Sequence, residues 1–127
     1  MIITDNKKLW DVQREFHAMF SHLRIEFYQG HHGAGQGSPV KDKLKGELVL
    51  GSVRTVHVEG DFEVNGDLTV AEFEQSFFEK YGLNVQVFRK SGNLWMQTTS
   101  TDSWTLNEQN RKGGSSEQHY KEKYKDV

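Results

Sequence analysis

Cysteine is absent from this chain of 127 residues, which excludes a disulfide framework, a thiolate metal site and a cysteine nucleophile. A chain without cysteine also suits a reducing compartment. No apolar run approaches the roughly 20 residues that a membrane helix needs. The opening segment, MIITDNKKLW, becomes charged too early for a signal peptide. We therefore expect a cytoplasmic protein that does not associate with a membrane.

A strong excess of either charge is also lacking, since the formal net charge is −2. This balance predicts neither a nucleic-acid partner nor a strongly basic ligand. The charge is unevenly spread, because residues 111–127 hold five Lys or Arg against three Asp or Glu. That segment has no aliphatic residue except the last, so we expect residues 114–127 to form a disordered polar tail. Residues 1–113 are long enough to form one domain with a buried core.

Two segments have the pattern of an amphipathic helix followed by a strand with one buried face. The helices are predicted over residues 5–20 and 70–81, and the strands over LRIEFY (23–28) and LNVQVF (83–88). Apolar residues of the helices align at a constant offset, as Leu9, Val12, Phe16 and Phe20 with Val70, Phe73, Phe77 and Tyr81. We interpret the pattern as a duplicated helix–strand unit, although any two amphipathic pairs share some of it.

After the second strand, RKSGN is a turn and LWMQTT (94–99) is the return strand of a hairpin. Thr105 and Glu108 form a capping box, which predicts a short last helix that stops at Gly113 or Gly114. The sequence leaves the secondary structure of the segment 44–68 undecided, because Leu50 and Val53 fit a short helix whereas Val56 and Val58 fit a strand. The predicted fold class is α+β, with the helices packed on one face of a small, mainly antiparallel sheet.

The segment QGHHGAGQGSPVKDK, residues 29–43, carries glycines at alternate positions beside His31 and His32. A dinucleotide site would need the spacing G-x-G-x-x-G before a helix, and a phosphate loop would need Lys after the last glycine. Neither is present. Adjacent histidines on an extended chain point in opposite directions, which disfavours their binding one metal ion. We interpret the segment as a flexible Gly-rich loop that links the two units.

A formal calcium motif occupies residues 61–72, DFEVNGDLTVAE. Oxygen-bearing side chains stand at the EF-hand positions, namely Asp61, Glu63, Asn65, Asp67 and Glu72. The same letters have a local explanation, in which Phe62 and Val64 face the core, Asn65-Gly66 forms a turn, and Thr69 with Glu72 caps the next helix. The local explanation is preferred, because no helix enters the loop and no second loop pairs with it.

The aromatic residues suggest a binding surface. If Leu94 and Met96 face the core, Trp95 points away from it beside Phe88, with Trp104 near them and Tyr28 as the counterpart of Phe88 in the first unit. Such a row can stack on a ligand or on the apolar side chain of a partner. A helix, a loop or a second copy of the chain would otherwise cover it. Catalytic motifs such as G-x-S-x-G are absent, and no cofactor is expected.

The preferred hypothesis is therefore a non-enzymatic binding or assembly module, whose partner is another protein or a second copy of the chain. The alternatives are a calcium-responsive domain at residues 61–72 and an enzyme that uses His57 or His22 with a nearby carboxylate.

The stretch EKYGLNVQVFRKSGNLWMQTTSTDSWTLNEQNRKG, together with the upstream FSHLRIEFY and the GSP segment, carries a resemblance. It resembles a family of small bacterial conserved proteins that has no assigned activity, and the likeness covers most of residues 4–113. The resemblance implies a bacterial cytoplasmic setting and transfers no catalytic residue.

Overall fold

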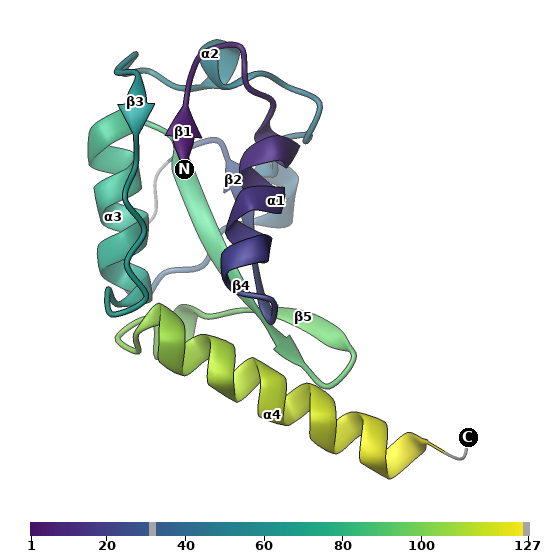
Figure 1. Cartoon of the computed structure of the whole chain (residues 1–127). Coiled ribbons are helices and arrows are strands. Elements are labelled where there is room, and N and C mark those ends of the chain that lie inside the picture. Colours follow the sequence, from purple (N-terminus) through teal and green to yellow (C-terminus); the bar gives the residue numbers. More distant parts are fainter. Residues whose placement is uncertain (31–32, 126–127) are drawn as a thin grey trace.

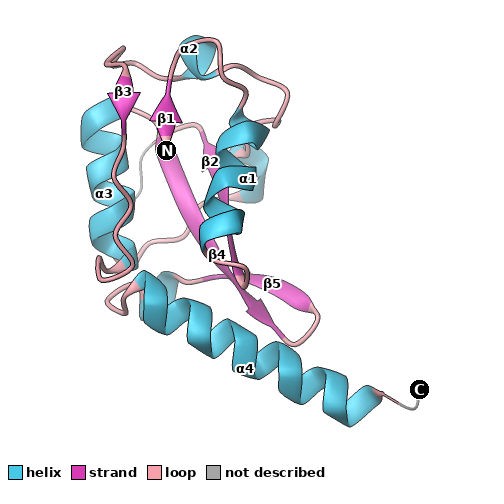
Figure 2. Cartoon of the chain, in the orientation of Figure 1, coloured by secondary structure: helices cyan, strands magenta, loops and turns pink. Residues whose placement is uncertain are grey.

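The computed structural model describes residues 1–30 and 33–125. The chain is an α+β protein, in which helices surround two small antiparallel sheets (Figure 1). In chain order the elements are β1 (Ile2–Ile3), α1 (Leu9–Met19), β2 (Leu23–Tyr28), α2 (Leu50–Val53), β3 (Gly60–Asp61), α3 (Val70–Tyr81), β4 (Asn84–Ser91), β5 (Leu94–Gln97) and α4 (Leu106–Tyr124), with short 3-10 turns at Val40–Asp42 and Thr99–Thr101. Figure 2 separates the helices from the strands.

The larger sheet has the strand order β2–β4–β5, and both pairings are antiparallel. Ile25 lies opposite Val87, and Lys90 lies opposite Trp95. Successive side chains of a strand point to opposite faces. One face therefore carries the odd-numbered residues of β2 and β4, and the other carries Arg24, Phe88 and Trp95. We call the second one the outer face.

The core lies on the odd-numbered face, between the sheet and the helices. Leu23, Ile25 and Phe27 of β2 are buried together with Val85 and Val87 of β4. The apolar stripes of α1 and α3 pack against them, and all eight residues of the two predicted stripes are buried. Contacts link α1 to β2, α3 to β4, and α4 mainly to β4. The predicted helix 70–81 is confirmed, with its capping box between Thr69 and Glu72.

Residues 5–8 form a turn instead of the first turn of the predicted helix. The chain from this turn into α1 exchanges backbone hydrogen bonds with residues 46–51, and we call such an exchange between two segments a crossing. The first crossing joins the amide groups of Leu9, Trp10, Leu50 and Gly51 to the carbonyl groups of Leu48, Gly46, Lys7 and Asp5, respectively. The second crossing joins the amides of Val70, Ala71, Leu106 and Asn107 to the carbonyls of Trp104, Asp102, Leu68 and Gly66. The bonded residues between 66 and 71 lie 61 positions after their counterparts between 5 and 10. Those between 102 and 107 lie 56 positions after their counterparts between 46 and 51.

The last helix is longer than the sequence indicated. It runs through Gly113 to Tyr124, so the predicted stop at Gly113 or Gly114 is wrong. Residues 114–124, expected to be disordered, are helical, and residues 126 and 127 lie outside the described residues. Two features hold the helix. Gly113 allows a close approach to the His22 carbonyl, where any Cβ would lie 2.9 Å from the oxygen. Farther along, Ser116 Oγ accepts a 2.8 Å hydrogen bond from the Gly92 amide of the hairpin.

The Gly-rich loop lies on the outer face of the sheet. The amide of Ser38 donates to Gln97 Oε1 at 3.0 Å, and Gln97 Nε2 donates to the Ser38 carbonyl at 2.8 Å. The Gly35 amide donates to Asp102 at 2.6 Å. Ser38 is buried by this packing. The loop, expected to link the two units freely, thus covers part of the sheet, whereas His31 and His32 lie outside the described residues.

Candidate functional site

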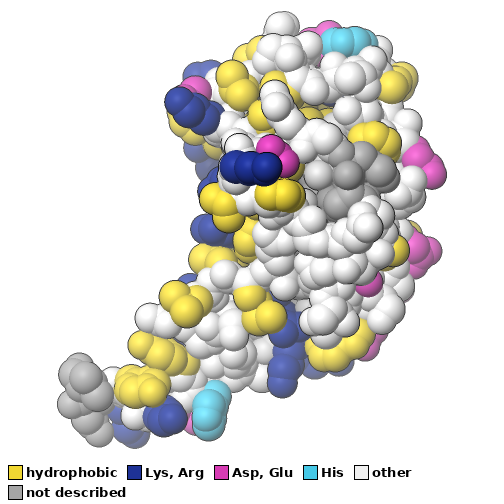
Figure 3. Space-filling model, turned by 180° about the vertical axis from the view of Figure 1, so that it is seen from behind, with side chains coloured by type: hydrophobic (Ala, Val, Ile, Leu, Met, Phe, Trp, Pro, Cys, Tyr) yellow, Lys and Arg dark blue, Asp and Glu magenta, His cyan; other side chains and the backbone are white. Residues whose placement is uncertain are grey.

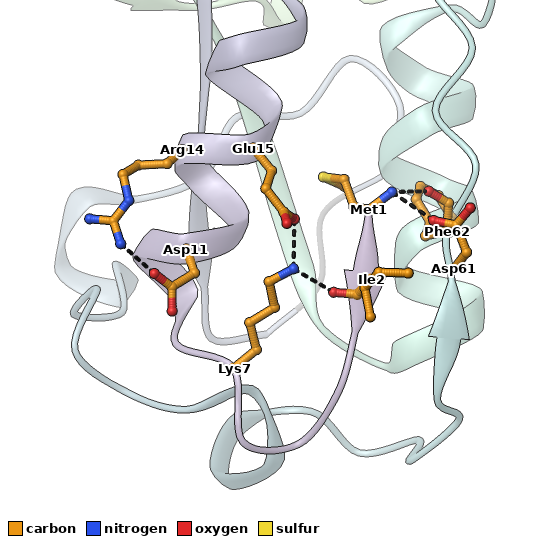
Figure 4. A network of polar contacts seen from close by, with 8 residues as sticks. All are labelled: Met1, Ile2, Lys7, Asp11, Arg14, Glu15, Asp61 and Phe62. Carbon is orange, nitrogen blue, oxygen red and sulfur yellow. Dashed lines mark hydrogen bonds and ion pairs between the residues drawn. The ribbon is translucent and has the colours of Figure 1, made fainter.

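The side chains of the calcium motif take part in the contacts of turns, caps and strand ends. Asp61 accepts a 2.8 Å hydrogen bond from the amino group of Met1, which also donates to the Phe62 carbonyl at 3.0 Å (Figure 4). Asn65 Oδ1 accepts from the Asp67 amide at 2.9 Å. The Glu72 carboxylate accepts a hydrogen bond from the Thr69 amide. Hydrogen bonding to the backbone of Thr69, and next to its side chain, holds the pKa of Glu72 below its usual value.

Glu63 is exposed, Asp67 accepts from Asn107 at 3.4 Å, and Phe62 is buried in the core. Among the residues that the structure describes, no three His, Asp or Glu side chains converge closely enough to hold a metal ion. The arrangement matches the local explanation of this segment.

Two of the histidines lie near carboxylates. His57 Nδ1 is 3.0 Å from Asp5 Oδ1, and His22 Nδ1 is 3.5 Å from Glu117 Oε2. The side chains of Asp5 and His57 remain 41% and 48% exposed, respectively, so solvent surrounds both. Asp5 also pairs at 2.6 Å with Arg54, whose side chain is fully buried. This cluster ties the first turn of the chain to the segment after α2, which is a structural role.

The Asp5 cluster gives stability that depends on pH. The hydrogen bond from His57, followed by that from Arg54, holds the pKa of Asp5 below its ordinary value of 3.8. A carboxyl group with a lowered folded-state pKa stabilises the fold above its ordinary pKa, and this contribution is lost as the pH falls through the lowered value. We expect Asp5→Asn to lower the free energy of unfolding at neutral pH. Below about pH 4, we expect the stability of this variant to fall less steeply with pH than that of the wild type.

Urea denaturation over a pH series measures this effect. Asp11→Asn is the matched control, since the pair of Asp11 with Arg14 is exposed (Figure 4) and exposed pairs contribute little. An acid loss of stability that is equally steep in wild type and Asp5→Asn would show that Asp5 has no part in it.

The four aromatic residues predicted to bind do not form one surface. Tyr28 is buried, and this burial raises the pKa of its hydroxyl to about 12. Trp104 precedes α4 and lies 5.6 Å from the guanidinium of Arg89, which is on the core side of the sheet. Phe88 and Trp95 are half-buried on the outer face, where the guanidinium of Arg24 lies 5.6 Å and 5.0 Å from their ring centres. The structure therefore brings together Phe88 and Trp95 only.

Beside Trp95 the structure has a groove of about 560 Å³ with mainly apolar walls, here called the Trp95 groove. Residues of α1 and of the edge strand β2 line the groove, together with Trp95 of β5. The nine lining residues are Trp10, Gln13, Arg14, His17, Ala18, Arg24, Ile25, Glu26 and Trp95. The sequence interpretation missed Trp10 and His17. A sequence signal exists for Trp10, because this large aromatic residue stands next to the apolar stripe of α1 and not in it. In the structure Trp10 is 39% exposed.

Hydrogen bonds from α1 to the edge of β2 fix the groove. Gln13 Nε2 donates to the Ile25 carbonyl at 2.9 Å, and His17 Nδ1 donates to the Leu23 carbonyl at 2.7 Å. The ring of His17 meets Trp95 edge-on, with 6.0 Å between the ring centres. Because both side chains use strand carbonyls as acceptors, the helix and the strand cannot shift against each other without losing these bonds.

Basic side chains surround the aromatic rings of the groove. The amino group of Lys90 lies 4.8 Å from the ring centre of Trp95, and that of Lys8 lies 5.0 Å from the ring centre of Trp10. Glu26 accepts from Gln13 at 2.9 Å and lies 3.5 Å from Lys43. Figure 3 shows hydrophobic side chains interleaved with Lys and Arg along one edge of the molecule.

Compared with models of known protein families, with curated proteins and with solved structures, the chain matches none. Over residues 1–30 and 33–125, no helix combines the length and the apolar character that crossing a membrane requires. The groove itself therefore remains the candidate site, since it combines two tryptophans, hydrogen bonds that hold α1 to β2 and nearby basic side chains.

Proposed function

We propose that the chain is a non-enzymatic binding module that holds a short segment of a partner protein in the Trp95 groove. The observation that carries this proposal is the position of Trp95, which lines a mainly apolar groove together with Trp10. Tryptophan and arginine are the residue types that most often dominate the energy of protein interfaces, and Arg24 adjoins Trp95. A large apolar cleft with a few polar groups is the usual form of a binding site.

The size of the groove favours a segment over a second copy of the chain. Nine residues line it, whereas a stable interface between two proteins takes about 20–30 residues from each side. A groove of this size accommodates one or two side chains of a peptide. Self-association through the same surface is the competing outcome, and sedimentation of the free protein distinguishes it, because we expect a monomer.

We also propose that the fold is a duplicated unit whose helices α1, α3 and α4 share the odd-numbered face of the sheet. The identical hydrogen bonds of the two crossings support the duplication. Each crossing also brings one glycine against an Asp or Asn side chain, as Gly51 meets Asp5 and Gly66 meets Asn107. Burial of Val85, Val87 and Arg89 on that face supports the shared packing. The cysteine-free sequence and the family resemblance support a bacterial cytoplasmic setting.

Selection from a phage-displayed library of random short peptides tests the proposed function. We expect peptides that bind the wild type and Trp104→Ala but not Trp95→Ala. Trp104 is the matched control, because it is a half-buried tryptophan beside Arg89, outside the groove. If the enriched peptides bind Trp95→Ala as well as the wild type, the groove is not the binding site and the proposal fails.

A further inference from the structure

We infer that the segment held by the Trp95 groove is acidic, with an apolar anchor residue between carboxylates. This inference rests on the proposed function and adds the chemistry of the partner. The anchor follows from the walls of the groove, since Trp10, Ala18 and Trp95 offer apolar surface. Burying an apolar side chain against such surface is favourable in proportion to the area removed from water.

The carboxylates follow from the charge of the rim. Five basic side chains contact the rings or carboxylates of this region, namely Lys8, Arg14, Arg24, Lys43 and Lys90, and they face three carboxylates, Asp11, Glu26 and Glu117. Asp11 pairs with Arg14, and Glu26 already lies near Lys43 and Arg24. The rim therefore keeps an excess of positive charge, which attracts an acidic partner and speeds its approach.

Arg24 and Lys90 are the cations closest to Trp95, at 5.0 and 4.8 Å from its ring centre. Carboxylates on either side of an anchor seated beside Trp95 are within reach of both. Lys90 also acts on Glu117, whose pKa is lowered chiefly by Lys121 and to a smaller extent by Lys90. Arg24 is accordingly the stronger candidate for the partner's carboxylate, because the acid that pairs with it among the described residues, Glu26, lies 3.9 Å away.

The second unit of the proposed duplication has a pocket at the corresponding place. Gln13 and Arg14 of the groove correspond, at the offset of 61 seen in the crossings, to Glu74 and Gln75 of α3. Those two residues line a second pocket, of about 390 Å³, between α3 and β4. Gly33 and Ala34 of the chain's own loop line that pocket too. A loop segment, which turns between Gly33 and Gln36, thus already lies against the corresponding site, and this supports a chain segment as the occupant of the Trp95 groove.

Calorimetric titration with synthetic peptides tests the inference. The probe is the acetylated, amidated peptide Ser-Glu-Asp-Phe-Glu-Asp-Ser, and its isosteric control replaces every acid by the amide. We expect the acidic peptide to bind at least about tenfold more tightly, a factor set by roughly one charge-assisted contact. Arg24→Gln and, separately, Lys90→Gln should reduce that preference, whereas Lys112→Gln, near Trp104, should leave it intact. Raising the salt concentration should weaken the acidic peptide alone.

The outcomes separate the inference from the proposed function. Equal binding of both peptides, lost in Trp95→Ala, overturns the acidic partner and leaves the binding groove standing. If neither peptide binds in a Trp95-dependent way, the inference is wrong, and the library selection then decides the proposed function. Displacement of the acidic peptide by single-stranded oligothymidylate at a lower concentration than by unlabelled peptide also overturns it, because the groove would then serve a nucleic acid.

Discussion

Phe77→Ala is expected to lower the free energy of unfolding by about 3–5 kcal/mol, as truncation of a fully buried phenylalanine does. Phe77 has no exposed surface, and its ring lies 4.9 Å from Tyr81, 5.4 Å from Phe62 and 5.8 Å from Phe27, measured between ring centres. Phe27 belongs to β2, so the ring joins α3 to β2. Its loss leaves a cavity between them that the sheet is too constrained to fill.

Equilibrium urea denaturation followed by circular dichroism measures the effect of Phe77→Ala. The control is Leu94→Ala, since Leu94 is 68% exposed on β5 and surface substitutions usually change stability by less than about 0.5 kcal/mol. A change below about 1 kcal/mol for Phe77→Ala would contradict the shared core, because it would mean that the ring packs loosely.

Trp95→Ala is expected to weaken peptide binding about 30-fold or more, which corresponds to about 2 kcal/mol and to the loss of an interface hot spot. Three contacts give Trp95 this weight, from Arg24, Lys90 and the ring of His17. Removing the indole takes one wall from the groove, takes the ring from Lys90 and leaves Arg24 with the ring of Phe88. The dissociation constant of a library-selected peptide, measured by calorimetry, checks the prediction.

Trp95→Phe and Trp104→Ala are the controls for Trp95→Ala. The phenylalanine keeps a ring in the groove and should recover part of the affinity, whereas Trp104→Ala should leave it unchanged. Thermal unfolding of each variant separates a lost contact from a lost fold. If Trp95→Phe binds no better than Trp95→Ala in proteins of equal stability, aromatic contact is not the source of the affinity.

Local pattern predicted those elements whose apolar residues repeat regularly. The stripe from Val70 to Tyr81 fixed the position of α3, and the capping box at Thr69 fixed its first residue. Alternation in LRIEFY and LNVQVF predicted β2 and β4. These signals are local, because a helix or strand reveals its buried face within its own residues.

The remaining features depend on contacts between distant residues. The pairs Glu117–Lys121 and Gln118–Glu122 stabilise the continuation of α4 locally, but the close approach at Gly113 depends on the His22 carbonyl, about ninety positions away. Ser38 is held by Gln97 across the outer face, so the loop around it reads as a free linker. The groove was found only in part for the same reason. Alternation predicted that Trp95 shares a face with Phe88, but Leu94 and Met96, expected in the core, are exposed. The neighbour of Trp95, His17, comes from a helix far away in the sequence.

The tryptophan indoles provide the most direct test of the Trp95 groove. Nitrogen-15 correlation spectra report the side-chain N–H of Trp10, Trp95 and Trp104 separately, once the signals are assigned by single substitutions. On addition of a library-selected peptide, we predict that the signals of Trp10 and Trp95, which line the groove, shift together while that of Trp104 stays in place. A shift of the Trp104 signal with no change at Trp10 and Trp95 would contradict the account.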